Sequence, residues 1–102
     1  MTDPLVEFVR ARLEEGRDSA HATAHALARN AETLHLRPER AVVHAQGLVT
    51  AAEARIRLFE ETVCPYLWVD GRAGRLADLQ LRLLACEHTA HADYRPEWAP
   101  AD

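Results

Sequence analysis

The six histidines of this 102-residue chain are its most unusual functional groups. His21 and His25 are four residues apart, so on a helix both imidazoles point to one side and could share a divalent metal ion. Asp18 lies one turn earlier on that side. The alternative is a solvated polar face on which Asp18 pairs with His21. We favour the solvated face, because these residues lie well away from the apolar stripe of the same segment.

Two carboxylate-x-x-histidine pairs, Asp18 with His21 and Glu32 with His35, match the spacing used in di-iron helical bundles. Both pairs lie on one segment, about 21 Å apart along a continuous helix. They can share ions only if the segment folds back or a second subunit supplies one pair. We do not expect a di-iron site.

A stronger metal candidate combines Cys86, His88 and His91, with Cys64 as a fourth ligand. Zinc favours thiolate and imidazole ligands in a tetrahedron, and it would anchor the C-terminal tail. The alternative is structural: a free cysteine on an apolar stripe behaves as a small hydrophobic residue. A histidine near a helix C-terminus is also favoured by the helix dipole. The sequence contains no Cys-x-x-Cys motif.

Nucleophilic catalysis would fall to Cys64, which precedes Pro65. No glycine-flanked nucleophile elbow, oxyanion-hole signature or phosphate-binding glycine loop accompanies this cysteine. We therefore expect a protein that is not an enzyme.

Four aromatic residues lie outside the expected long helices, and such residues are favoured both in cores and at binding hot spots. One interpretation is that Tyr94 and Trp98 fix the C-terminal tail on the helices. The other is that the aromatics contact a partner, with Tyr66-Leu67-Trp68 forming the central patch. The candidate partner-binding residues are Tyr66, Trp68, Tyr94 and Trp98.

The helices that the sequence predicts would position these residues. Asp3 before Pro4 is a capping carboxylate followed by a proline at the first helical position, and it predicts a helix over 4–34 with a bend or break at Gly16. Pro38 opens a second helix over 38–62. The apolar stripe of the first helix is Leu5, Val9, Leu13, Ala20, Ala24, Leu27, Ala31 and Leu34. The stripe of the second is Ala41, Ala45, Leu48, Val49, Ala52, Ile56, Phe59 and Val63.

The rest of the chain reads as a loop over 64–74, a third helix over 75–88 and an irregular tail over 89–102. The apolar stripe of the third helix is Leu76, Leu79, Leu83 and Cys86. The predicted fold is all-α: an antiparallel helical hairpin, a shorter third helix and an ordered, irregular C-terminal tail, forming one small domain over 1–102.

Composition limits the classes of function. All 12 basic residues are arginine, against 16 acidic residues, and the net charge is −4. Such a chain is a poor candidate for binding nucleic acid. No apolar run approaches about 20 residues, and the first residues do not form a signal peptide, so we expect neither a membrane segment nor secretion. Nineteen alanines leave a thin core, which favours help from a partner subunit, close helix packing or a metal.

The tail His91-Ala92-Asp93-Tyr94-Arg95-Pro96-Glu97-Trp98 resembles the terminal signature of an uncharacterised family of small actinobacterial and actinophage proteins. Leu5 to Glu15, Arg37 to Val42, Glu53 to Arg57 and Leu81 to Ala85 are similar to further segments of that family. The resemblance implies a small helical protein and supplies no activity.

These observations predict a small, cytoplasmic, non-enzymatic protein without a cofactor, acting in protein interaction or regulation. The partner would be another protein or a second copy of the chain, in a homodimer. The alternative is a zinc-binding protein that uses Cys64, Cys86, His88 and His91.

Overall fold

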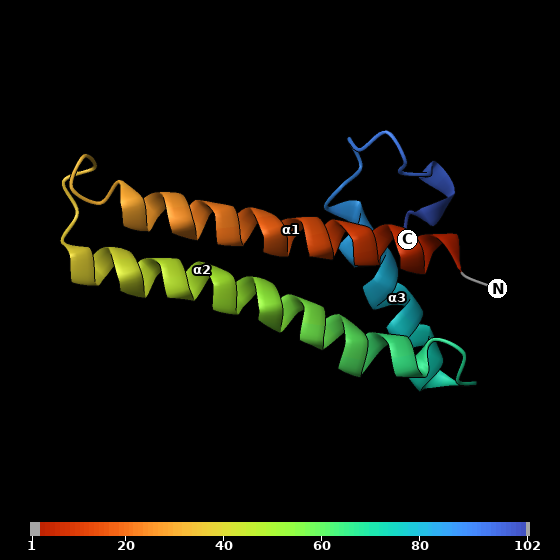
Figure 1. Ribbon diagram of the computed structural model, residues 1–102. Coiled ribbons are helices and arrows are strands. Elements are labelled where there is room, and N and C mark those ends of the chain that lie inside the picture. Colours follow the sequence, from red (N-terminus) through yellow and green to blue (C-terminus); the bar gives the residue numbers. More distant parts are fainter. Residues whose placement is uncertain (1–2, 102) are drawn as a thin grey trace. The chain divides into compact units, whose positions relative to one another are not determined.

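The computed structural model describes residues 3–101, and most of that range is helical (Figure 1). No β-strand occurs among the described residues. The all-α prediction of a hairpin, a third helix and an ordered tail is confirmed. In chain order the elements are α1 (Pro4–Arg29), α2 (Pro38–Leu58), a π-helical turn (Phe59–Val63), a 3₁₀ turn (Cys64–Tyr66), α3 (Arg72–Cys86) and a second 3₁₀ turn (Pro96–Trp98).

The start of α1 is capped as predicted, since the amide of Leu5 donates a 2.8 Å hydrogen bond to Oδ1 of Asp3. α1 continues through Gly16, so the helix is not broken at this residue. A side chain at Gly16 would meet nothing within 4 Å. None of the described helices is long and apolar enough to cross a bilayer.

The α-helical geometry of the first segment ends at Arg29 and not at Leu34, because the chain closes a turn before Pro38. His35 has a left-handed φ of 59°. Its amide bonds to the carbonyl of Glu32 at 3.1 Å, and the amide of Leu36 bonds to Ala31 at 2.8 Å. This pair of bonds is a Schellman motif with histidine at the position that glycine usually occupies.

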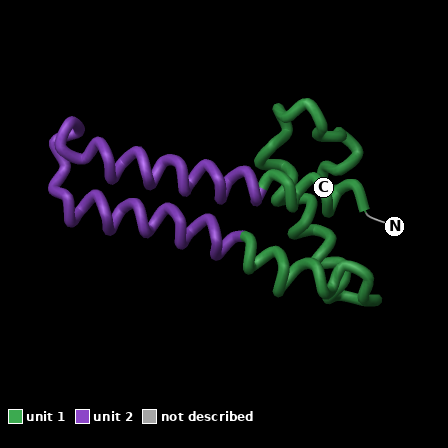
Figure 2. The backbone as a smooth tube through the Cα atoms, viewed as in Figure 1, with its two compact units in different colours: residues 1–12, 56–102 green, residues 13–55 purple. Residues whose placement is uncertain are grey.

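Contacts divide the chain into two units, which are described separately (Figure 2). Unit 2, Leu13–Arg55, is an antiparallel hairpin made from parts of α1 and α2. Its buried residues are alanines only: Ala31, Ala41 and Ala45. This seam buries little apolar area, because alanine has a single methyl group.

Unit 1 combines Met1–Arg12 with Ile56–Asp102 and holds the large buried side chains. Arg10 of α1 connects to the π-helical turn: its Nε donates to Oε1 of Glu60 at 3.0 Å, and its guanidinium lies 5.5 Å from the ring centroid of Phe59. The carboxylate of Glu60 raises the pKa of Arg10. The buried apolar residues of unit 1 are Leu5, Phe8, Val9, Phe59, Val63, Ala77, Leu81, Ala85 and Trp98.

α3 packs with the face opposite to the predicted one. An apolar stripe normally faces the core, which led us to expect that Leu76, Leu79 and Leu83 would be buried. Their exposed fractions are instead 45%, 41% and 50%. The buried residues of α3 are Gly74, Ala77, Leu81 and Ala85. This helix is therefore apolar on two sides, and it packs with the side on which most side chains are small.

Gly74 is where α3 meets the chain that precedes it. A Cβ built on Gly74 would lie 1.7 Å from the carbonyl oxygen of Val69 and 3.5 Å from that of Tyr66. The backbone over 66–69 therefore rests directly on the first turn of α3. Only glycine leaves space for this contact.

We expect Gly74→Ala to lower the free energy of unfolding by about 1–3 kcal/mol, because the methyl group must displace a backbone carbonyl. The matched control is Gly47→Ala in α2, where a Cβ meets nothing within 4 Å. That variant should gain about 1 kcal/mol from helix propensity. Urea unfolding followed by circular dichroism measures both. Equal effects of the two substitutions would contradict the close contact at Gly74.

Candidate functional site

The C-terminal tail folds over the ring of Phe8, forming an aromatic cluster. The ring centroid of Phe8 lies 5.5 Å from that of His91, 6.0 Å from Tyr94 and 5.0 Å from Trp98. His88 also contacts the ring edge-on, at 6.3 Å. Edge-to-face pairs at these separations are attractive beyond the area they bury. Phe8 lies outside the apolar stripe predicted for the first helix, so periodicity did not identify it.

His91 has several contacts in this cluster. Its Nδ1 accepts the amide hydrogen of Asp93 at 3.0 Å, and its Nε2 contacts the guanidinium of Arg12. The same guanidinium lies 5.1 Å from the ring centroid of Phe8, in cation–π geometry. His91 thus helps to fix the turn of the tail against α1.

Arg82 fastens the end of the tail to α3. Its Nε donates to Oδ2 of Asp78 at 2.9 Å, while Nη1 donates to the carbonyl oxygens of Glu97 and Trp98 at 3.2 and 3.3 Å. Arg95 lies 5.3 Å from the ring centroid of Trp98. These contacts explain why a segment without helical periodicity is ordered.

The four candidate partner-binding aromatics occupy two different environments. Trp98 is buried and Tyr94 is half-buried, both within the Phe8 cluster. Trp68 is 75% exposed and Tyr66 is 47% exposed. The structure therefore gives Tyr94 and Trp98 a role in holding the tail, while Tyr66 and Trp68 remain accessible.

The two tryptophans form a matched pair for testing this difference. Trp98→Ala should lower the free energy of unfolding by about 3–5 kcal/mol, or abolish cooperative unfolding, because it empties a buried cluster. Trp68→Ala should change it by no more than about 0.5 kcal/mol, since the side chain is at the surface. Chemical denaturation measures both. A large loss with Trp68→Ala would show that this ring is packed.

The candidate zinc ligands have separate contacts in the structure. Sγ of Cys64 lies 3.8 Å from Nη2 of Arg10, and Sγ of Cys86 lies 3.9 Å from the hydroxyl of Tyr94. His88 and His91 both lie against Phe8. Among residues 3–101, no three cysteine, histidine, aspartate or glutamate side chains are grouped as metal ligands.

On the polar face of α1, the partner of His21 differs from the one expected. Nε2 of His21 lies 3.5 Å from Oε1 of Glu53 on α2, so the neighbour of this imidazole is a carboxylate of the other helix and not Asp18. Both side chains are more than half exposed. A surface pair of this kind contributes little to stability.

Cys64 is half-buried beside two charged groups. Burial raises the pKa of its thiol, and the carboxylate of Glu60 raises it further, while Arg10 acts in the opposite direction. The thiol is therefore mostly protonated near neutral pH, whereas the nucleophile in cysteine chemistry is the thiolate.

We expect iodoacetamide to alkylate Cys64 more slowly in the folded protein than in the urea-unfolded chain at neutral pH, because the raised pKa leaves less thiolate. Glu60→Gln should accelerate the reaction, since it removes a negative charge near the sulfur. Glu61→Gln serves as the control, because Glu61 pairs with Arg57. Peptide mass spectrometry reports the rate at Cys64 separately from Cys86. Faster alkylation in the folded state would favour a reactive cysteine.

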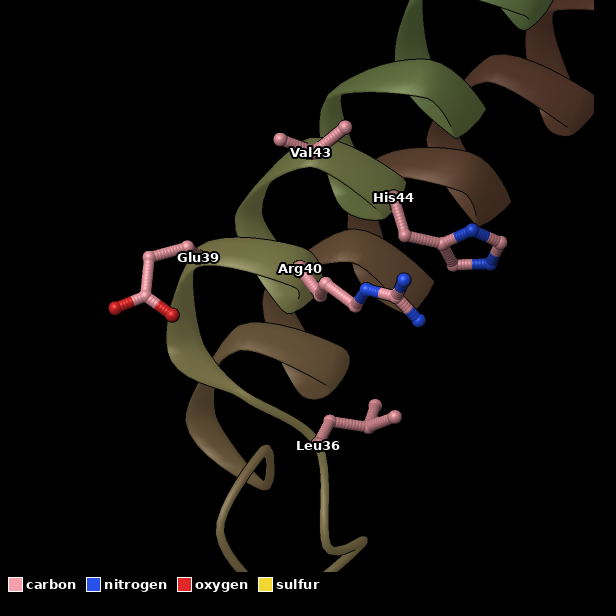
Figure 3. A pocket seen from close by; sticks show the side chains of 5 residues that line it. All are labelled: Leu36, Glu39, Arg40, Val43 and His44. Carbon is pink, nitrogen blue, oxygen red and sulfur yellow. The ribbon is translucent and has the colours of Figure 1, made fainter.

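A shallow hollow lies on α2 beside the hairpin turn (Figure 3). Leu36, Arg40 and His44 extend to the same side, whereas Glu39 points away. Val43 completes the lining. Among the described residues, the side chains of Glu39, Arg40 and His44 have no hydrogen-bond or ion-pair partner.

Among the described residues of unit 1, exposed large apolar side chains gather in α3 and the chain before it. We call Leu76, Leu79 and Leu83 the leucine face. Beside it, Leu79 lines a second hollow together with Leu67 and Val69. Arg75, Asp78 and Arg82 supply polar groups to the same hollow. This arrangement can bind an apolar side chain next to charged groups.

The position of the leucine face was missed because its spacing is that of a core stripe. A signal was present in the sequence: Gly74, Ala77, Leu81 and Ala85 form a second apolar stripe on the opposite side of the helix. Two opposed stripes on one helix indicate that one of them lacks an internal partner.

Comparison with protein families gives one match. Residues 2–100 match the family described as "Family of unknown function (DUF6221)", so the chain belongs to this family. The expectation of an uncharacterised family is confirmed at this level. No curated protein and no solved structure matches the chain.

Proposed function

We propose that this protein acts by binding another protein, without catalysing a reaction, through the leucine face of α3 and the neighbouring aromatic residues Tyr66 and Trp68. The observation that carries the proposal is that Leu76, Leu79 and Leu83 are exposed on the side of α3 opposite to its packed side. Exposed leucines of this kind lose unfavourable contact with water when a partner covers them.

The chain just before α3 adds apolar groups beside this surface, because Leu67 and Val69 line one hollow together with Leu79. Trp68, in the same segment, is the most exposed of the large apolar residues. Tryptophan is enriched among the residues that dominate binding energy at interfaces.

The proposal includes a cytoplasmic location and function without a bound cofactor. Function without a bound metal is supported by the contacts that His88, His91 and Cys86 make in the tail. Zinc bound by Cys64, Cys86, His88 and His91 would require these side chains to leave their present contacts.

The test is affinity capture from a lysate of the organism that encodes the protein, read by quantitative mass spectrometry. Wild type is compared with Trp68→Ala, Leu79→Glu and the control Val43→Glu, which places the same charge on an exposed apolar residue of unit 2. We expect at least one protein to be captured by wild type and Val43→Glu, with recovery reduced at least about tenfold by Leu79→Glu. Identical captured sets for all four baits would contradict the proposal.

A further inference from the structure

We propose that the leucine face binds an amphipathic helix whose apolar stripe is flanked by acidic residues. This inference rests on the proposed function and names the chemistry of its partner. Arg72, Leu76, Leu79 and Leu83 follow each other at spacings of four, three and four residues. That repeat is the seam along which one helix packs against another in coiled coils.

The dimensions of the leucine face suit a helix of a few turns. Leu76 and Leu83 are seven residues apart, or about 10 Å along the axis of α3. The two stripes of α3 point in opposite directions, so a helix on the leucine face does not compete with the packed side of α3. The hollow at Leu79, Leu67 and Val69 provides a site for a large apolar side chain of the partner.

The charges near the leucine face favour a partner helix with acidic residues. The first turn of α3 contains Arg72 and Arg75 and no acidic residue, and the N-cap Gly71 provides no side-chain hydrogen bond. The N-terminal end of a helix carries a partial positive charge, so cations there are unfavourable. Within residues 3–101, Arg72 and Arg75 form no ion pair. Carboxylates of a partner would offset both arginines and the helix dipole.

A second copy of α3 fits this surface less well. It would bring the same two arginines to the interface, and its carboxylates are few. Asp78 is already bound to Arg82. That leaves Glu87, at the C-terminal cap, as the acidic residue available beside the leucines of a second α3. An acidic helix from another protein supplies more negative charge at the positions where α3 needs it.

The experiment uses two synthetic helical peptides, each about three heptads long. Both carry leucines at the seam positions; one has glutamates at the flanking positions and the other has lysines. Each fluorescently labelled peptide is titrated with the full-length protein, and anisotropy reports binding. We expect the glutamate peptide to bind at least about tenfold more tightly than the lysine peptide, with a difference that shrinks as salt is added.

Protein variants locate the binding site. Leu79→Glu should weaken the glutamate peptide at least about tenfold, while the control Val43→Glu should bind it like wild type. The double variant Arg72→Glu and Arg75→Glu should reverse the preference in favour of the lysine peptide. Circular dichroism checks that each variant is folded, which is expected because every substituted side chain is exposed.

Several outcomes would overturn the inference: equal affinity for the two peptides, no binding by either, or equal effects of Leu79→Glu and Val43→Glu. Self-association that depends on Leu79 and excludes the peptides, seen by light scattering, would make a second copy the occupant and would also overturn it. If cellular capture depends on Leu79 but the glutamate peptide does not bind, the inference about acidic helices fails and the proposed function stands. If the peptide binds but capture yields no partner, the proposed function fails instead.

Discussion

The packing of unit 1 depends on the ring of Phe8. Side chains of the tail surround this ring, and Arg12 covers it from α1 itself. Phe8, Phe59 and Trp98 are large and buried. α3 joins this core with mostly small side chains. Its packed side carries Gly74, Ala77, Leu81 and Ala85, whereas Leu76, Leu79 and Leu83 are exposed and Leu84 is half-buried.

Unit 2 is packed differently from unit 1. Its buried residues are three alanines, whose burial removes little apolar surface from water. Alanine has the highest helix propensity, so the helices themselves are favoured even where packing contributes little. Large, energetically important contacts are concentrated in unit 1. The tail therefore matters more for stability than its lack of regular structure suggests.

Capping and proline signals in the sequence predicted where the helices start better than the apolar pattern predicted how they pack. Asp3 with Pro4 set the start of α1, and Pro38 set the start of α2, because capping and proline geometry act over a few neighbouring residues. The face of α3 could not be chosen in this way. Periodicity finds both of its apolar stripes, and the choice between them depends on rings supplied by α1 and the tail. Phe8 was missed for the same reason, since its partners are 80 or more residues away in the sequence.

The tail motif that carries the sequence resemblance is explained by packing. His91 contacts Phe8 and Arg12, Tyr94 contacts Phe8 and Trp98, and Arg95 lies over Trp98. A residue pattern used in this way identifies a fold and not an activity. Function should instead be sought where side chains are costly to expose and have no internal partner. In unit 1 that description applies to Leu76, Leu79, Leu83 and Trp68, which keep between 41% and 75% of their surface exposed.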